Sequence, residues 1–126
     1  MSDRNIHLGK SGEELAGRFL KENGYQILAK NYRSRFGEID IVAREKDCIC
    51  FIEVKARKDT DFGLPQEAVD FRKQRKISKV ALAYLKESRL LDAKARFDVV
   101  SVLFEGAGPR IKLTKNAFEL SPQYGY

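Results

Sequence analysis

The stretch FGEIDIVAREKDCICFIEVKAR, residues 36–57, decides the fold because it joins two β-strand patterns that carry charges in unusual places. Branched and apolar residues recur in both halves, and a polar break at Lys46 and Asp47 separates them, as in a β-hairpin. A hairpin that turns at this break pairs residues whose numbers sum to 93. This register sets the carboxylates of Asp40 and Glu53 directly opposite each other.

The same register predicts which side chains share a face of the hairpin. Because side chains alternate along a strand, Glu38 and Lys55 fall on the face of the two carboxylates, and Val42 and Phe51 continue that face. The other face is wholly apolar and consists of Ile39, Ile41, Ala43, Cys50, Ile52 and Val54. We therefore expect one face to build the core and the other to hold a charged cluster, unless a bulge shifts the register.

The charged cluster has two interpretations. Opposed carboxylates repel each other unless a cation lies between them, and Mg²⁺ prefers such oxygen ligands. Lys55 could then hold a phosphate oxygen or orient an attacking water, which suits phosphodiester hydrolysis. Alternatively, Glu38 pairs with Lys55 in a cross-strand ion-pair network that has Asp40 and Glu53 at its edge. The residues alone leave both interpretations open.

Length and composition predict one cytoplasmic domain over residues 1–126. The chain is 43% hydrophobic and 33% charged, and it has no run near the roughly 18 apolar residues of a membrane span. Its first residues lack the apolar core of a signal peptide. Cys48 and Cys50 are too close to bond each other and too few for a four-ligand zinc site, so we expect them to act as small hydrophobic residues.

The segment before the hairpin, SGEELAGRFLKENG at residues 11–24, has the apolar spacing of an amphipathic helix. Ser11 and Glu14 have the spacing of a capping box, which gives Glu14 a local structural role. Glu13 falls at the flank of the apolar stripe. Glu13 is therefore the residue expected to reach a site between helix and sheet.

The remaining segments predict three further strands and one long helix. Residues 25–35 form the first strand, and residues 64–91 form a helix with Pro65 in its first turn. Residues 96–104 have apolar side chains at both odd and even positions, as in a strand that is covered on both faces. Residues 111–118 predict a short strand and a final helical turn. This order predicts an α/β fold with a mixed sheet flanked by helices.

The net charge of +6 and a pI near 9.4 favour a polyanionic partner. The segment FRKQRKISK, residues 71–79, concentrates cations at the start of a helical pattern. Such residues near a metal site neutralise phosphates, whereas the alternative is a solvated helix face. The residues predicted to bind nucleic acid are Arg57, Arg72, Lys73, Gln74, Arg75, Lys76 and Lys79.

Four blocks of sequence carry a resemblance to a known family. GEELAGRFL, NYRSRFGEIDIVAR, FIEVKAR and RFDVVSV resemble the YraN-like family of small bacterial endonuclease-like proteins, which is similar to the archaeal Holliday-junction resolvases. The EVK of residues 53–55, preceded by Asp40, resembles the core of the PD-(D/E)xK nuclease superfamily, although Ile39 replaces the superfamily's proline. The likeness extends over residues 8–118. It implies a restriction-endonuclease-like fold with that core.

The resemblance also implies roles for individual residues. Asp40 and Glu53 would hold Mg²⁺ or Mn²⁺, Lys55 would assist the attacking water, and Glu13 would complete the catalytic site. Glu38 is kept as a candidate further member. The sequence thus predicts a metal-dependent endonuclease that cleaves DNA, including branched or single-stranded DNA. Two alternatives remain, namely a non-catalytic module that binds nucleic acid or docks a partner, and a structural protein, and a homodimer is left open.

Overall fold

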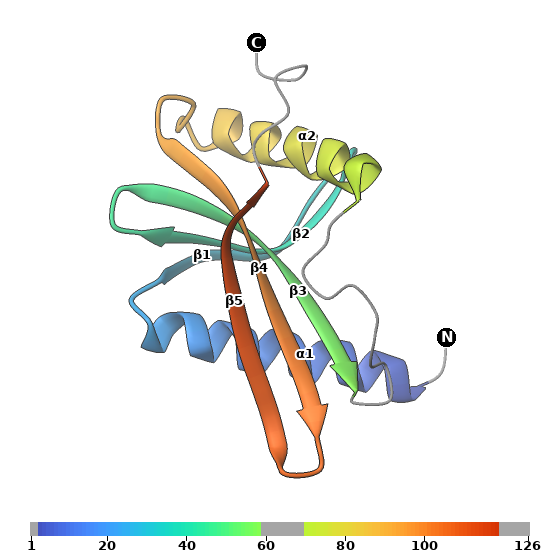
Figure 1. Ribbon diagram of the computed structural model, residues 1–126. Coiled ribbons are helices and arrows are strands. Elements are labelled where there is room, and N and C mark those ends of the chain that lie inside the picture. The colour runs from blue at the N-terminus through green and yellow to red at the C-terminus, as the bar shows by residue number, and fades with distance from the viewer. Residues whose placement is uncertain (1–2, 59–69, 119–126) are drawn as a thin grey trace.

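The chain forms a five-stranded mixed sheet between two helices within residues 3–58 and 70–118, the part that the computed structural model describes (Figure 1). Side chains are described from residue 9. The elements are α1 (Asp3–Glu22), β1 (Gln26–Ser34), β2 (Gly37–Glu45), β3 (Cys48–Lys58), α2 (Phe71–Glu87), β4 (Lys94–Glu105) and β5 (Gly108–Phe118).

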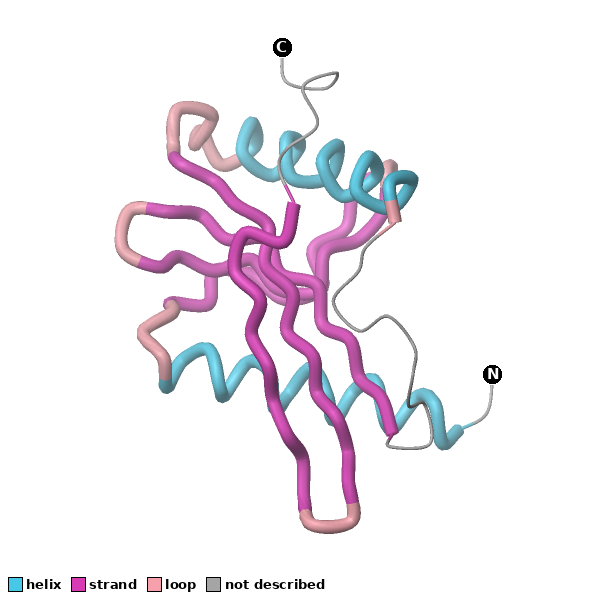
Figure 2. Tube along the Cα trace, viewed as in Figure 1, coloured by secondary structure: helices cyan, strands magenta, loops and turns pink. Residues whose placement is uncertain are grey.

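The strands lie in the order β1-β2-β3-β4-β5, and only the β3–β4 pair is parallel. Parallel neighbours need a crossover, and α2 lies within this one. In Figure 2, α1 and α2 lie on opposite sides of the sheet, and the turn between β4 and β5 extends beyond α1. The predicted α/β fold with a mixed, helix-flanked sheet is confirmed, and it is consistent with a restriction-endonuclease-like fold.

Each helix closes its own apolar core against one face of the sheet. Under α2, Val80 and Leu85 pack with Phe51 and Phe97. Under α1, a second cluster contains Ala16, Leu20, Ile41, Ile52, Val100 and Val102. Residues 97–102 of β4 are all buried, as predicted for a strand covered on both faces. Within the described residues, no helix combines the length and the apolarity that a membrane span requires.

The β2–β3 hairpin has the predicted register over residues 41–45 and 48–52, but the predicted pairs Asp40–Glu53 and Glu38–Lys55 lie beyond the paired residues. Ile41 pairs with Ile52 and Glu45 with Cys48, so the paired residue numbers sum to 93. The predicted apolar face is confirmed for Ile41, Ala43, Cys50, Ile52 and Val54, which pack together under α1. The prediction that Val42 and Phe51 continue a charged face is wrong. Val42 and Phe51 are 0% and 1% exposed and lie in the core under α2. Sequence alternation alone could not reveal that a second helix covers this face.

The alternation of side chains also breaks at Asp40. Ile39 packs in the core under α2, whereas Ile41 packs in the core under α1, so the two do not share a face as predicted. Opposite this point, Asn31 of β1 has a φ of 52°, in the left-handed region. Asp40 is absent from the paired residues of β2 with both β1 and β3, and its Oδ2 accepts a 2.8 Å hydrogen bond from the backbone N–H of Val54.

The helix boundaries differ from those predicted. Helix α1 begins at Asp3, so Ser11 and Glu14 lie inside it and the predicted capping box is wrong. A Cβ on Gly12 would lie 2.7 Å from the Cβ of Ala56, which shows that α1 approaches β3 closely at this turn. Helix α1 therefore includes the start that Ser11 and Glu14 predicted, and it packs along β3 at this turn.

Helix α2 begins at Phe71, and the side chain of Asp70 caps it by accepting a 2.8 Å hydrogen bond from Lys73 N. The first-turn role predicted for Pro65 lies outside the described residues. Strand β5 continues to Phe118, so the helical turn predicted within residues 111–118 is wrong. Its pairing with β4 supplies backbone partners that a local pattern does not contain.

Candidate active site

Three carboxylates from three elements approach one another at the break in β2. Asp40 of β2 interacts electrostatically with Glu53 of β3 and with Glu13 of α1, and a side-chain hydrogen bond links it to Glu13. Asp40 is not among the paired residues of β2, and Asn31 on the neighbouring strand β1 has a φ in the left-handed region. The structure thus brings together three of the four residues that the sequence predicted as catalytic.

Asp40 is strongly perturbed by these surroundings. Burial raises its pKa from 3.8 to about 7, and the negative charge of Glu53 adds to the rise. The hydrogen bond from Val54 N acts in the opposite direction, while Glu13 raises the pKa further. A hydrogen bond between two carboxyl groups requires a proton on one of them. The cluster therefore favours a proton, or another cation, near Asp40.

Glu53 has a cationic partner on α2. Its Oε1 forms an ion pair with Nζ of Lys73, in the first turn of the helix that Asp70 caps. The Glu53 side chain is 14% exposed and that of Lys73 is 47% exposed. The cap therefore fixes the part of α2 that delivers this ammonium group to the carboxylate cluster.

Lys55 lies two residues beyond Glu53 on β3, so both side chains leave the strand on the same face. Burial lowers the pKa of the half-buried Lys55, and the positive charge of Lys73 lowers it further. Glu53 opposes this change. A lysine with a lowered pKa exchanges its proton more readily than an exposed one, which suits a role beside a reacting group.

The chemistry of these ligands fits Mg²⁺ or Mn²⁺. Among residues 9–58 and 70–118, no three His, Cys, Asp or Glu side chains already surround one point as metal ligands do. Mg²⁺ does not require such a cage, because it is commonly bound by one or two carboxylates, several waters and a substrate phosphate. Asp40 and Glu53 can supply that pair of carboxylates. For both carboxylate oxygens of Glu53 to be available to the metal, the ion pair between Lys73 and Glu53 would have to break.

A pocket of about 220 Å³ opens beside Asp40 on the side of α1. Its lining includes Glu13 together with the cations Lys10 and Lys30, and Asn31 also borders it. Sequence analysis did not find these last three residues, because their proximity depends on how α1 crosses β1. Cations beside clustered carboxylates are compatible with a ligand that carries negative charge.

Comparison with known proteins assigns the chain to a family. The Uncharacterised protein family UPF0102 matches residues 12–102, a range that includes Glu13, Asp40, Glu53 and Lys55. The chain belongs to the UPF0102 family. A UPF0102 protein from Syntrophus aciditrophicus is 53% identical over 118 residues, which cover 94% of this chain and 93% of that protein. A UPF0102 protein from Geobacter metallireducens is 52% identical over 121 residues, which cover 96% and 99% of the two chains.

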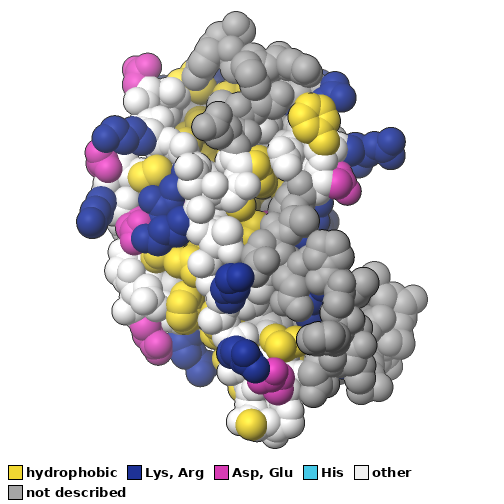
Figure 3. Space-filling model, viewed as in Figure 1, with side chains coloured by type: hydrophobic (Ala, Val, Ile, Leu, Met, Phe, Trp, Pro, Cys, Tyr) yellow, Lys and Arg dark blue, Asp and Glu magenta, His cyan; other side chains and the backbone are white. Residues whose placement is uncertain are grey.

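In this UPF0102 protein, most of the residues predicted to contact nucleic acid lie on α2, whereas Arg57 lies on β3. Arg72, Lys73, Arg75 and Lys76 are exposed, whereas Arg57, Gln74 and Lys79 are half-buried. Figure 3 shows Lys and Arg side chains projecting around the start of α2, and acidic groups are interspersed with the Lys and Arg side chains on this face. Nucleic-acid binding by these residues remains a prediction.

Glu38 pairs with a residue other than the one predicted for it in the ion-pair alternative. It is exposed and pairs with Arg33, its neighbour on β1, with 3.2 Å between Nε of Arg33 and Oε2 of Glu38. Because the pair is exposed to water, it contributes little to stability. Glu38 therefore serves as a control carboxylate on the same strand as Asp40.

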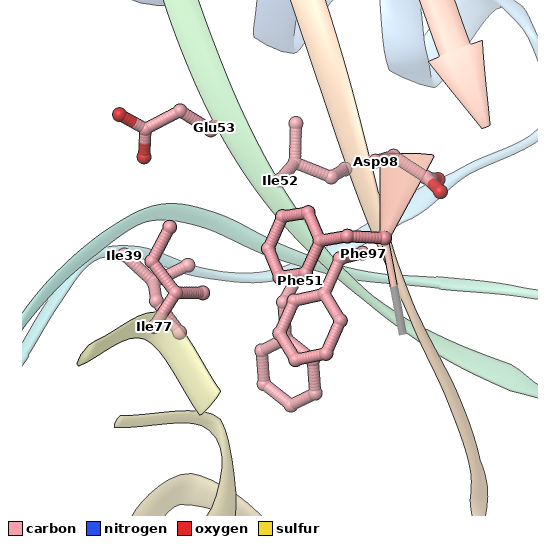
Figure 4. Close-up of a pocket in the computed structure, with 8 residues that line it drawn as sticks. Ile39, Phe51, Ile52, Glu53, Ile77, Phe97 and Asp98 are labelled. Atoms are coloured by element: carbon pink, nitrogen blue, oxygen red, sulfur yellow. The ribbon is translucent and has the colours of Figure 1, made fainter. Parts of the chain in front are cut away.

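Below the candidate site, an apolar layer fills the space between the sheet and α2. Figure 4 shows Phe51, Phe97, Ile39 and Ile77 between the sheet and α2, with Glu53 at the edge of this layer. Asp98 points away from Glu53 in the same view. The carboxylate cluster is thus supported by packed side chains and does not include Asp98.

Asp98 belongs to a second polar cluster in this UPF0102 protein that sequence analysis missed. Arg96 Nε donates to both of its carboxylate oxygens at 3.0 and 3.1 Å, and an NH2 group of Arg96 donates to Tyr25 and Glu45 at 2.9 and 2.6 Å. Lys115 completes the cluster on Glu45. Asp98 is only 1% exposed, so these bonds offset the cost of burying its charge. The signal in the sequence was the pair of opposite charges, Arg96 and Asp98, on either side of Phe97 in an otherwise apolar strand.

Proposed function

We propose that this protein is a metal-dependent endonuclease that hydrolyses phosphodiester bonds in DNA. Asp40 and Glu53 would bind Mg²⁺ or Mn²⁺, Lys55 would act on the attacking water or the phosphate, and Glu13 would hold Asp40. The observation that carries the proposal is the convergence of three carboxylates from α1, β2 and β3 beside a lysine whose pKa is lowered.

The energetic cost of this cluster supports a functional role. Burying Asp40 next to two further acidic side chains raises its pKa to about 7, which disfavours its charged form. Structural positions seldom keep such an arrangement, whereas groups with strongly shifted pKa values concentrate at functional sites. The resemblance of residues 53–55 to the ExK of PD-(D/E)xK nucleases adds a second, independent argument.

The chain's own residues divide the work as follows. Val54 N–H and Glu13 fix the Asp40 carboxyl group, so that its orientation does not depend on the ligand. The chemistry that Mg²⁺ or Mn²⁺ supplies when bound is polarisation of a phosphate oxygen and a lowered pKa for the attacking water. Lys55 donates a hydrogen bond to that water or steadies negative charge on the phosphate. Exposed cations at the start of α2 would hold the flanking backbone.

A second candidate function is a nucleic-acid-binding module without catalysis. The ion pair between Lys73 and Glu53 favours it, because this pair already neutralises a carboxylate that the nuclease needs as a ligand. In that case the carboxylates and the lysines would form a structural network. The basic start of α2 would still bind DNA.

Two measurements on matched variants test the proposal. Calorimetric titration with Mn²⁺ should detect binding by the wild type and by the control Glu38→Gln, and much weaker binding by Glu53→Gln. Labelled branched, flapped and single-stranded DNA should be cleaved by the wild type with Mg²⁺ or Mn²⁺. Glu53→Gln and Lys55→Ala should lose cleavage by orders of magnitude while they retain DNA binding at matched salt.

The outcomes separate the two functions. Cleavage at wild-type rates by both Glu53→Gln and Lys55→Ala would exclude this site as the catalytic centre. If the wild type binds DNA but cleaves none of the substrates, and both variants bind equally well, the binding module is the correct function. Loss of Mn²⁺ binding in Glu38→Gln would show that general charge, rather than these ligands, governs the interaction.

A further inference from the structure

A second pocket lies outside the carboxylate cluster, on the solvent side of α2. It has a volume of about 410 Å³ and is lined by Phe36 from the β1–β2 turn and by Lys79, Leu82, Ala83 and Lys86 from α2. A volume of this size falls in the range of ligand sites. The four helical residues are spaced so that they share one face of α2.

The β1–β2 turn holds the Phe36 ring in place. Phe36 N donates a 3.1 Å hydrogen bond to the side chain of Ser34, which closes the turn. Gly37 follows with a φ of 147°, a conformation that strains other residues, and a Cβ there would lie 3.6 Å from Val80 of α2. The turn is therefore fixed against the helix, although the Phe36 side chain remains 37% exposed.

The ring is accompanied by cations. The guanidinium carbon of Arg35 lies 4.8 Å from the ring centroid, and Nζ of Lys79 lies 5.6 Å from it. Proteins that bind single-stranded nucleic acid combine these same two features, namely an aromatic ring on which a base stacks and nearby cations that neutralise the backbone. An exposed aromatic residue beside half-buried Leu82 and Ala83 offers the apolar surface that a base needs.

The charge of this surface argues against a second copy of the chain as its occupant. A twofold contact through this pocket would bring Lys79 and Lys86 of each copy near those of the other. Such like charges repel when they are brought together away from water. An anionic partner with flat apolar groups complements both the positive charges of the lysines and the aromatic ring of Phe36.

We propose that the pocket of Phe36, Lys79, Leu82, Ala83 and Lys86 binds single-stranded DNA, with one base stacked against Phe36. This inference deepens the proposed nuclease function and rests on it for the choice of DNA. In this inference, Phe36 and the outer face of α2 bind an unpaired segment of the DNA. The substrate class that follows is DNA with a single-stranded portion, such as a flap or a branch.

The absence of tryptophan from the sequence permits a direct test of stacking. Phe36→Trp places one tryptophan in the pocket, and Leu91→Trp places one at a control position that is 39% exposed in the wild type. An oligothymidylate of about 12 nucleotides, within the usual site size, is added in EDTA so that binding is measured without cleavage. We expect quenching of Trp fluorescence in Phe36→Trp and none in Leu91→Trp.

Affinity measurements give the second readout. Phe36→Ala should weaken binding of the oligothymidylate by roughly 5- to 150-fold, as expected for loss of one stacked base, and weaken binding of duplex DNA much less. Lys79→Gln and Lys86→Gln should each reduce the log-log salt slope by roughly 0.7 for single-stranded DNA. Lys21→Gln, which removes a cation from the last turn of α1, should leave the slope unchanged.

Each result decides the inference separately from the nuclease proposal. Quenching together with a loss of affinity in Phe36→Ala supports it, even if the wild type cleaves nothing. Unchanged affinity in Phe36→Ala overturns it, even if Glu53→Gln abolishes cleavage. Stronger quenching by oligoglutamate or by RNA than by the oligothymidylate also overturns it, because the surface would then be a site for an acidic peptide or for RNA.

Discussion

Replacing Asp40 by Asn tests the energetic account of the carboxylate cluster. The asparagine side chain has nearly the same shape, and its oxygen can still accept the hydrogen bond from Val54 N. It carries no charge, so the repulsion from Glu53 and the cost of burying a charge both disappear. We expect this variant to be more stable than the wild type in EDTA at alkaline pH, and nearly equal to it in acid.

The size of the effect follows from the pKa of Asp40. The unfolded chain releases this proton near pH 3.8 and the folded chain near pH 7, so proton binding stabilises the folded state below pH 3.8. That stabilisation is lost as the pH rises through the window from 3.8 to about 7. A shift of about 3 units sets an upper limit of about 4 kcal/mol. Since water and neighbouring groups relax around the charge, we expect a measured difference of roughly 2 kcal/mol.

The assay is urea denaturation followed by circular dichroism, at about pH 4 and about pH 8, on the wild type and Asp40→Asn. Glu38→Gln is the matched control, because it removes one carboxylate from an exposed pair on the same strand. A stability difference between Asp40→Asn and the wild type that does not change with pH would refute the reasoning. So would an equal pH-dependent gain in Glu38→Gln.

Three further predictions concern other parts of the molecule. Lys73→Ala should bind Mn²⁺ roughly fivefold more tightly in a calorimetric titration, because the ammonium group no longer competes for Glu53. An unchanged affinity would show that the ion pair does not weaken metal binding. Asp98→Ala should lower the free energy of unfolding by about 3 kcal/mol, because Arg96 loses its buried partner, and a loss below about 1 kcal/mol would contradict a structural role. Lys76→Gln should lower the log-log salt slope of duplex-DNA binding by roughly 0.9, whereas an equal slope would mean that Lys76 is only solvated.

The hairpin shows how much of the fold can be predicted from sequence. The break at Lys46 and Asp47, together with alternating apolar residues, predicted the pairing of Ile41 with Ile52 because a tight turn determines register locally. The mixed sheet was predictable for a similar reason. Each strand is a short pattern with clear ends, and the long helix between β3 and β4 implies a crossover.

The sequence by itself therefore determined the strands, their register and the carboxylates that could meet. Tertiary structure decided how they meet. Asp40 leaves the ladders on both sides of β2, α2 buries the Val42 face and brings Lys73 to Glu53, and α1 carries Glu13 to Asp40. These contacts join residues far apart in the chain, and their geometry follows from the packing of helices on the sheet. No local periodicity encodes the distance or angle at which that packing occurs.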